Sequence, residues 1–284
     1  MTRGARIGAA SAGLLLGAFV LVALVGSFHG SATALDAAPL EPPSADHPFG
    51  TDALGRDLLA RTGQGARTSA SIALVAVGAS LVVAVPLGIA AGWRAGGWFD
   101  AVAMRVVETT QVVPPLILVL LLLGAAGPGS AALGPFQLAA PTRIALCLAV
   151  AFVPFFARVV RSATMAERRS TYLAELQRLG VGRAELAVGE LLPNLLPVLA
   201  SQVLLALAIV VFAEGGLSFL GLGVAPPAPT LGGLVAEAGT QLLGTAWWYA
   251  LIPGLVLVAG ITGLNLAADA TATALDTRPS RTSS

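Results

Sequence analysis

Long apolar blocks constrain this chain more than any other feature of its sequence. Each is close to the roughly 20 residues that a helix needs to cross a hydrocarbon core of about 30 Å. They cover residues 7–28, 69–92, 106–123, 144–160, 191–222 and 247–266. Of the 284 residues only 11% are charged, far fewer than a soluble domain of this length needs to cover its surface. The sequence therefore predicts an all-α, polytopic membrane protein with about six transmembrane helices.

The blocks are predicted to be helices because a bilayer offers no water to the backbone. Each span must close its own hydrogen bonds, and a β-barrel would show short segments of alternating polarity, which the sequence lacks. A cleaved signal peptide is an alternative for the first block, since small residues follow at 31–34. The block is longer than the about 7–15 apolar residues of a signal peptide. We therefore interpret it as a retained helix.

The arginines indicate the orientation of the spans. If the amino terminus lies in the cytoplasm, twelve of the 16 arginines fall on cytoplasmic segments, and Arg56, Arg61, Arg67 and Arg143 fall outside. This asymmetry follows the positive-inside rule and predicts that both termini are cytoplasmic. The net charge is only +1 and lysine is absent, which argues against a basic face for nucleic acid.

The sequence contains no recognisable catalytic constellation. There is no nucleophile–base pair or zinc-binding helix motif, and the glycine-rich residues 63–68 lack the lysine of a phosphate-binding loop. Cys147 is the only cysteine, so no disulfide can form within the chain, and because it lies inside an apolar block it is expected to be a small buried hydrophobe. We therefore expect no enzyme activity, no ATP site and no cofactor on this chain.

Three polar side chains lie in or near the apolar blocks: Glu108, Gln111 and Glu214. A charge inside a membrane is costly and should face water or the bundle interior, so these residues are candidates for a translocation path. The alternatives are pairing with an arginine such as Arg105, or capping a break in a helix. Pro114 and Pro115 are predicted to kink the third block, either as a hinge or as a packing bend.

The polar segment 158–197 is the most patterned part of the chain. Tyr172, Leu176 and Leu179 are spaced i, i+4, i+7, which predicts a short helix with one apolar edge. Gly180 and Gly182 are expected to end it. A second short helix is predicted over residues 183–190. The first helix could dock in a groove of a soluble partner or lie on lipid headgroups, and the pattern alone leaves both open.

The same segment resembles the coupling loop of permeases of ABC importers. It reads Tyr172-Leu-Ala-Glu-Leu-Gln-Arg-Leu-Gly180, followed by Glu190-Leu-Leu-Pro193-Asn194. The family pattern is Tyr-Val-Glu-Ala-Ala, three variable residues and Gly, then His-x-Leu-Pro-Asn. This resemblance implies a helix that fits a cleft of a cytoplasmic ATPase. The residues assigned to coupling on this basis are Tyr172, Ala174, Glu175, Leu176, Leu179, Gly180, Glu190, Pro193 and Asn194.

The match departs from the family pattern at two places. Ala174-Glu175-Leu176 replaces Glu-Ala-Ala, so a bulky leucine stands where the family has a small residue. Glu190 replaces the histidine and reverses any positive charge there. We expect these departures to change how strongly the helix docks, and Glu190 to weaken or retune docking on the ATPase.

Two further stretches resemble the second, C-type subunit of the peptide/nickel permease family. His47-Pro-Phe-Gly-Thr51-Asp52-Ala-Leu-Gly55-Arg56-Asp57 is similar to that subunit's first extracytoplasmic segment. Residues 213–223, with Pro226-Pro227 after them, are similar to the end of its fifth helix. His47, Asp52 and Asp57 could also be metal ligands, but turn and helix-cap chemistry is the favoured interpretation, so no metal site is predicted.

The resemblance covers residues 47–276 and implies a type I ABC-importer bundle. It implies a first transmembrane helix and extracytoplasmic segment over residues 1–66, and a core permease domain over 67–284 with the coupling loop at about 166–194. The expected partners are a second homologous permease, two ATPase subunits that carry ATP and magnesium, an extracytoplasmic binding protein and membrane lipid, with no nucleic acid.

The implied function is ATP-driven import of peptides or related small solutes through the inner, cytoplasmic membrane. Import of a nickel complex is an alternative within the same family. A self-sufficient secondary transporter or channel is the alternative from another class, and inverted repeats with broken helices would favour it. The sequence contains no clear internal repeat.

Overall fold

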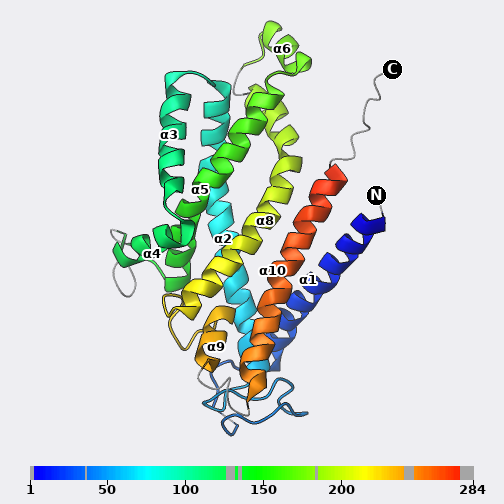
Figure 1. Cartoon of the computed structure of the whole chain (residues 1–284), viewed down its shortest axis with the longest axis vertical. Helices are drawn as coiled ribbons and strands as arrows, with labels where there is room; N and C mark the ends of the chain where they lie inside the picture. The colour runs from blue at the N-terminus through cyan, green and yellow to red at the C-terminus, as the bar shows by residue number, and fades with distance from the viewer. Residues whose placement is uncertain are drawn as a thin grey trace.

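The computed structural model describes residues 3–35, 37–125, 132–133, 136–182, 185–239 and 246–275. Long helices run side by side along the longest axis of the molecule (Figure 1). A short antiparallel pair, β1 (Ala132–Leu133) and β2 (Phe136–Gln137), lies between α4 and α5. The helices are α1 (Arg3–His29), α2 (Leu58–Trp93), α3 (Trp98–Val112), α4 (Pro115–Ala125), α5 (Ala140–Glu167), α6 (Thr171–Arg178), the π-helix η1 (Leu186–Leu191), α8 (Leu192–Phe219), α9 (Leu231–Ala238) and α10 (Trp247–Leu275). This architecture confirms the predicted all-α, polytopic class.

Five of the described helices are long and apolar enough to cross a membrane, and the bent pair α3 and α4 makes a sixth if it counts as one span. The axes of α3 and α4 differ by 90°. The break lies at Pro114 and Pro115, since proline lacks the backbone donor of a helix interior and clashes with the preceding turn. The predicted kink of the third block is therefore confirmed, as a sharp bend.

The second span begins eleven residues earlier than its apolar block predicts, at Leu58 rather than Ser69. Its first turn is capped by Asp57, whose Oδ1 accepts a hydrogen bond of 2.7 Å from the backbone N–H of Ala60. The predicted role of Asp57 as a helix cap is thus confirmed. The polar Arg61 and Thr62 are buried in this first part of α2, and the predicted boundary after residue 66 falls inside the helix.

The main apolar core lies between α2, α5 and α8. Two glycines of α2 allow α5 to come close. A Cβ on Gly88 would lie 2.6 Å from the Cβ of Val160, and one on Gly92 would lie 2.7 Å from the Cβ of Thr164. Small residues at such positions let helix backbones approach and gain van der Waals contact, which replaces the hydrophobic driving force that is missing in lipid.

The elements separate toward two ends of the bundle (Figure 1). Helix α6 projects at one end, and α1 begins and α10 ends on the side toward it. Helix α9 lies at the opposite end, together with the segment between α1 and α2. We call these the α6 end and the α9 end. The two candidate motifs of the sequence therefore lie at opposite ends of the molecule.

Candidate functional site

A short helix is present where the sequence predicts one, as α6, and it lies beyond the ends of the long helices (Figure 1). Gly180 follows it with φ of +86°, a conformation that glycine adopts without strain. The backbone N–H of Val181 then bonds to the carbonyl of Leu176 at 3.2 Å, which closes the last turn. The predicted helix end at Gly180 is therefore confirmed.

The side chains of α6 divide into an anchored part and an exposed part. Leu173 is fully buried, and Tyr172 and Leu176 are half-buried. Glu175 is exposed, and Leu179, just after the last helical residue, is 80% exposed. The predicted apolar edge is therefore not buried as a unit within this chain. Leu173 provides the anchor that the i, i+4, i+7 pattern did not include.

The first and last residues of the coupling-loop motif meet on a third side chain that the sequence reasoning missed. Tyr172 donates its Oη hydrogen to Glu167 Oε1 at 2.6 Å. Asn194 Nδ2 donates to the same Oε1 at 3.1 Å and to the Tyr172 oxygen at 2.6 Å. Burial and the hydrogen bond to Glu167 both raise the pKa of Tyr172, so its hydroxyl stays protonated. The cluster joins the end of α5 to α6 and to the start of α8.

The remaining residues of the loop differ in part from expectation. The predicted helix over residues 183–190 is present where the structure describes it, as Glu185 and η1. It is not a separate helix, because η1 runs directly into α8 as one span, Leu186–Phe219. The wider π-turn ends just before Pro193, which cannot donate to the helix, so the change of register accommodates the proline. Pro193 and Glu190 are both exposed. The side chain of Ala174 and residues 183–184 lie outside the described part.

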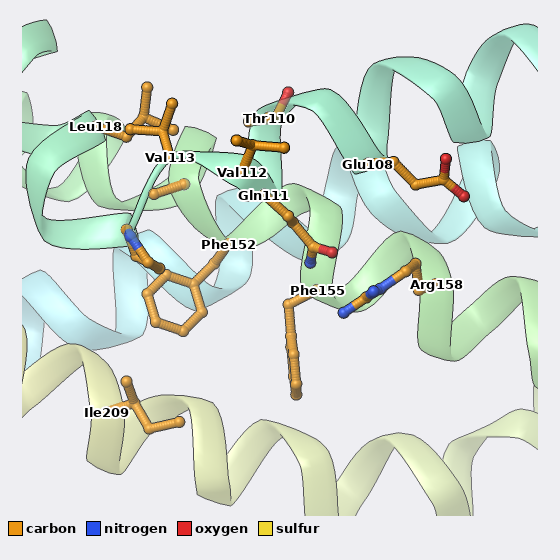
Figure 2. A pocket seen from close by; sticks show the side chains of 12 residues that line it. Glu108, Thr110, Gln111, Val112, Val113, Leu118, Phe152, Phe155, Arg158 and Ile209 are labelled. Atoms are coloured by element: carbon orange, nitrogen blue, oxygen red, sulfur yellow. The ribbon is translucent and has the colours of Figure 1, made fainter.

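A pocket of about 540 Å³ lies beside the bend between α3 and α4, against α5 and α8 (Figure 2). One end is polar and holds Glu108, Gln111 and Arg158. The other end is apolar, with Phe152 of α5 and Ile209 of α8. Two of the three predicted path residues, Glu108 and Gln111, are thus brought together, and Arg158 joins them.

Glu214, the third predicted path residue, does not line this pocket. It is fully buried on α8, where its Oε1 accepts a hydrogen bond of 2.6 Å from Ser218. Of the alternatives that the sequence left open, pairing with Arg105 finds no support among the described residues. The role of Glu214 in a translocation path stays a prediction.

The motif Thr51 to Asp57 lies at the α9 end and forms a buried charge network. Asp52 pairs with Arg61 and accepts a hydrogen bond of 2.6 Å from Arg56 Nε. Glu237 of α9 accepts from Arg61 at 2.8 and 3.2 Å, and from the hydroxyl of Tyr249 of α10 at 3.3 Å. This network joins the segment before α2 to α2, α9 and α10.

The pKa of Asp52 reflects opposing influences. Burial raises it, but the backbone N–H groups of Arg56 and Leu54 and the charge of Arg61 outweigh burial and hold the pKa below its ordinary value. Asp52 is therefore ionised at neutral pH, as its two arginine partners require.

The other motif residues also have structural partners. Thr51 Oγ1 donates to the carbonyl of Ala38 at 2.7 Å, and Asp57 lies 2.8 Å from His47 Nδ1. Gly55 has φ of +79° and faces the backbone of Ala37, where a side chain would clash. No group of three or more potential ligands arranged for a metal ion is found among the described residues. Thr51, Gly55 and Asp57 thus make turn and cap contacts within the chain.

Comparisons with known proteins agree with this geometry. Residues 84–281 match the family described as binding-protein-dependent transport system inner membrane component. The chain is 32% identical over 271 residues to the dipeptide transport system permease protein DppC of Bacillus subtilis (strain 168), covering 94% of this chain and 81% of the relative. It is 33% identical over 231 residues to the di/tripeptide transport system permease protein DppC of Pseudomonas aeruginosa (strain UCBPP-PA14), covering 80% and 71%.

The fold also matches a solved transporter. An inward facing conformation of the MetNI methionine ABC transporter superposes with a TM-score of 0.60 at 17% identity, covering 75% of this chain and 94% of that one. This likeness confirms the predicted type I importer fold, and the relatives confirm the resemblance to C-type peptide permeases. The chain therefore belongs to the family of inner membrane components of binding-protein-dependent transport systems, as a multi-pass permease subunit.

Proposed function

We propose that this chain is one permease subunit of an ATP-driven importer that moves short peptides across the cytoplasmic membrane. The observation that carries the proposal is the hydrogen-bonded cluster of Tyr172, Glu167 and Asn194 under the projecting helix α6. A helix that is tied to two spans and presents exposed side chains outward is suited to pass a partner's movement into the bundle.

The partners of this function are a second homologous permease, two ATPase subunits that hold ATP and magnesium, and an extracytoplasmic binding protein. Helix α6 docks in a cleft of one ATPase with its exposed Leu179 and Glu175, while the buried Leu173 anchors it to its own chain. Closure of the ATPases on ATP pulls α6, and hydrolysis lets it return. This cycle needs a bundle with two arrangements that bind the partners differently.

The cluster of Tyr172, Glu167 and Asn194 links a movement of α6 to the two helices that form the pocket wall. Glu167 is the last residue of α5, and Asn194 lies in the first turn of α8. These two helices also carry Phe152, Arg158 and Ile209 of the pocket wall. Arg158 is nine residues before Glu167, which is about 14 Å along a helix. A rigid movement of α5 therefore changes the pocket without any rearrangement within the helix.

The α6 end faces the cytoplasm in this proposal. Arg94 follows the last residue of α2, and Arg161 and Arg168 lie at the end of α5, as the positive-inside rule expects of cytoplasmic ends. Both termini are then cytoplasmic, and the segment before α2 is extracytoplasmic. The substrate class follows from the relatives, two of which are named for dipeptides or for di- and tripeptides. A nickel complex is the competing cargo.

The test begins with purification of the tagged chain from its native host in mild detergent, followed by mass spectrometry of the proteins that copurify. We expect a second permease, ATPases and a binding protein. The recovered complex is then placed in liposomes with a radiolabelled dipeptide, with and without enclosed ATP and with and without the binding protein. Uptake that needs both supports the proposal. Uptake by this chain alone without ATP contradicts it and indicates a secondary transporter or channel.

A further inference from the structure

We propose that the pocket at the α3–α4 bend binds a peptide through the two charged termini of the peptide. Arg158 binds the carboxylate, and Glu108 binds the ammonium group. The inference rests on the proposed function, because it assigns the substrate to a site within the permease. It adds Arg158 to the predicted translocation path. The polar end of the pocket binds the charged termini, and the apolar end binds a side chain of the peptide.

Two opposite charges with open bonding capacity lie at the polar end of the pocket. Glu108 is exposed on α3 and Arg158 is exposed on α5, and both line the same pocket. Neither forms a hydrogen bond or an ion pair among the described residues. Figure 2 shows the guanidinium of Arg158 pointing toward Phe155 and Gln111, with Glu108 on the facing helix. A charge within a span is costly unless it faces water or an opposite charge. A ligand with two charged termini supplies an opposite charge to each of these two side chains.

The neighbouring arginine shows what a structural pair looks like at the same place. Arg161, one turn further along α5, is held by Asp100 of α3 through Nε at 2.5 Å and Nη2 at 2.7 Å. This two-bond pair fixes α3 to α5 without help from Arg158 or Glu108. Glu108 also exerts an electrostatic attraction on Arg161, but both bonds of that guanidinium go to Asp100. Arg158 therefore remains available to a ligand.

The rest of the pocket fits the middle of a short peptide. Its volume of about 540 Å³ falls in the range of roughly 300–1,000 Å³ that is usual for small-molecule sites. The amide of Gln111 lies beside the charged end and can bond to a peptide group, since it carries both donors and an acceptor. Phe152 and Ile209 at the other end offer an apolar surface to a side chain. A zwitterion with an apolar side chain matches both ends.

The test uses the purified complex in lipid nanodiscs without the binding protein, so that only the permease selects the ligand. The probe is the dipeptide alanyl-photoleucine, in its free form, with an acetylated amino group, and with an amidated carboxyl group. Ultraviolet light cross-links the bound probe, and mass spectrometry locates the labelled residues. We expect label on the α5 and α8 walls of the pocket. Free probe should label about tenfold more than either blocked form, as expected for one lost charge-assisted hydrogen bond.

Variants separate binding from a structural role. Arg158→Gln should lower labelling by free probe to the level of the amidated probe, with little further loss for the amidated probe itself. Glu108→Gln should do the same for the acetylated probe. Arg158→Lys keeps the charge and should retain most of the labelling. Arg105→Gln removes a charge from the same helix as Glu108, outside the pocket, and should leave all three signals unchanged.

The inference is wrong if the wild-type complex labels equally with all three probes, or if the label falls outside the pocket. The same preparation is then assayed for ATP-dependent uptake with its binding protein present. Normal uptake together with unselective labelling overturns the site and leaves the proposed function standing. Absence of ATP-dependent uptake overturns the proposed function itself, whatever the labelling.

Discussion

Arg61 shows at the scale of one residue how this chain keeps charge inside a helical bundle. Its side chain is fully buried in the second turn of α2, and arginine stays protonated in proteins. The cost of burial is offset by two carboxylates, one from Asp52 just before α2 and one from Glu237 on the distant helix α9. Asp52 also accepts a hydrogen bond from Arg56, and Glu237 accepts one from Tyr249. Removal of Arg61 therefore leaves these two carboxylates in place without the charge that balances them.

We predict that Arg61→Gln lowers the free energy of unfolding by about 3–5 kcal/mol, the usual cost of breaking a buried ion pair from one side. Thermal unfolding of the detergent-solubilised protein measures the change. Arg67→Gln is the matched control, because Arg67 lies on the same helix but is exposed, and within the described part of the chain its side chain bonds only to Ser27. The double variant Arg61→Gln with Glu237→Gln should lose less than the two single variants added together. Equal melting of Arg61→Gln and Arg67→Gln would contradict a stabilising role for the network.

A second residue-scale prediction concerns pH. The folded protein holds the pKa of Asp52 below its ordinary value of 3.8, so the ionised form is favoured by folding. Such a group contributes stability that is present above the unfolded pKa and is lost as the pH falls through the folded pKa. The difference in melting temperature between wild type and Asp52→Asn should therefore stay constant above about pH 5 and shrink below about pH 4. A difference that grows on acidification would reverse the assigned sign.

At the scale of elements, α6 depends on the rest of the chain for its shape. A helix of eight residues is too short to be stable alone in water. It is held by the buried Leu173, by the turn at Gly180 and by the bonds of Tyr172 to Glu167 and Asn194. The position of α6 relative to α5 and α8 therefore rests on few contacts, which makes each of them open to a functional test.

We predict that Tyr172→Phe reduces the stimulation of ATPase activity by the loaded binding protein severalfold, because the hydroxyl that joins α5, α6 and α8 is lost. Basal ATPase activity of the complex should change little. The chain has only two tyrosines, so Tyr249→Phe is a matched control that removes one hydroxyl at the opposite end. Tyr249→Phe should leave the stimulation ratio unchanged. The same loss of stimulation in both variants would mean that Tyr172 has no special part in coupling.

Glu190 carries a separate prediction at this scale. It is exposed on η1, at the position of the histidine in the coupling-loop pattern that the sequence resembles, and its charge acts on Tyr172. If Glu190 weakens docking, Glu190→His should increase substrate-stimulated ATPase activity. Glu185→His makes the same change at an exposed position just before η1 and should have little effect. If Glu190→His changes neither the ATPase rate nor its stimulation by substrate, Glu190 has no part in docking.

At the scale of the whole molecule, the sequence predicted the spans better than their ends. Apolar blocks and the Pro114-Pro115 break located the six spans, because hydropathy and proline geometry act locally. The apolar pattern predicts a start of α2 that is too late, because Arg61 and Thr62 are polar. Ion pairs with Asp52 and Glu237 allow Arg61 to be buried there. Glu237 is 176 residues from Arg61, and no local pattern reports such a contact.

The candidate sites followed the same division. The coupling motif could be assigned from its own residues, since helix, glycine and proline signals are local. The hydrogen bonds of Glu167 to Tyr172 and Asn194 could not be predicted, because no sequence pattern indicates the partners of a carboxylate that precedes a short helix. The pocket likewise depends on how α3 packs against α5. Glu108 and Gln111 stand out as polar residues in an apolar block, whereas the sequence pattern places Arg158 at the start of a polar segment.

The orientation of the whole bundle is the last prediction. In a Cys147→Ser background, which leaves no cysteine, we introduce Ala45→Cys in the segment between α1 and α2 or Gln177→Cys on α6. Both positions are exposed and lie at opposite ends of the molecule. The chain is expressed without its partners so that α6 is uncovered. A membrane-impermeant maleimide should label Ala45→Cys in intact cells, and Gln177→Cys only after the membrane is permeabilised. The positive-inside rule requires this result because the arginines concentrate toward the α6 end. The reverse pattern would place α6 outside, where no ATPase can reach it, and would therefore overturn the coupling role together with the topology.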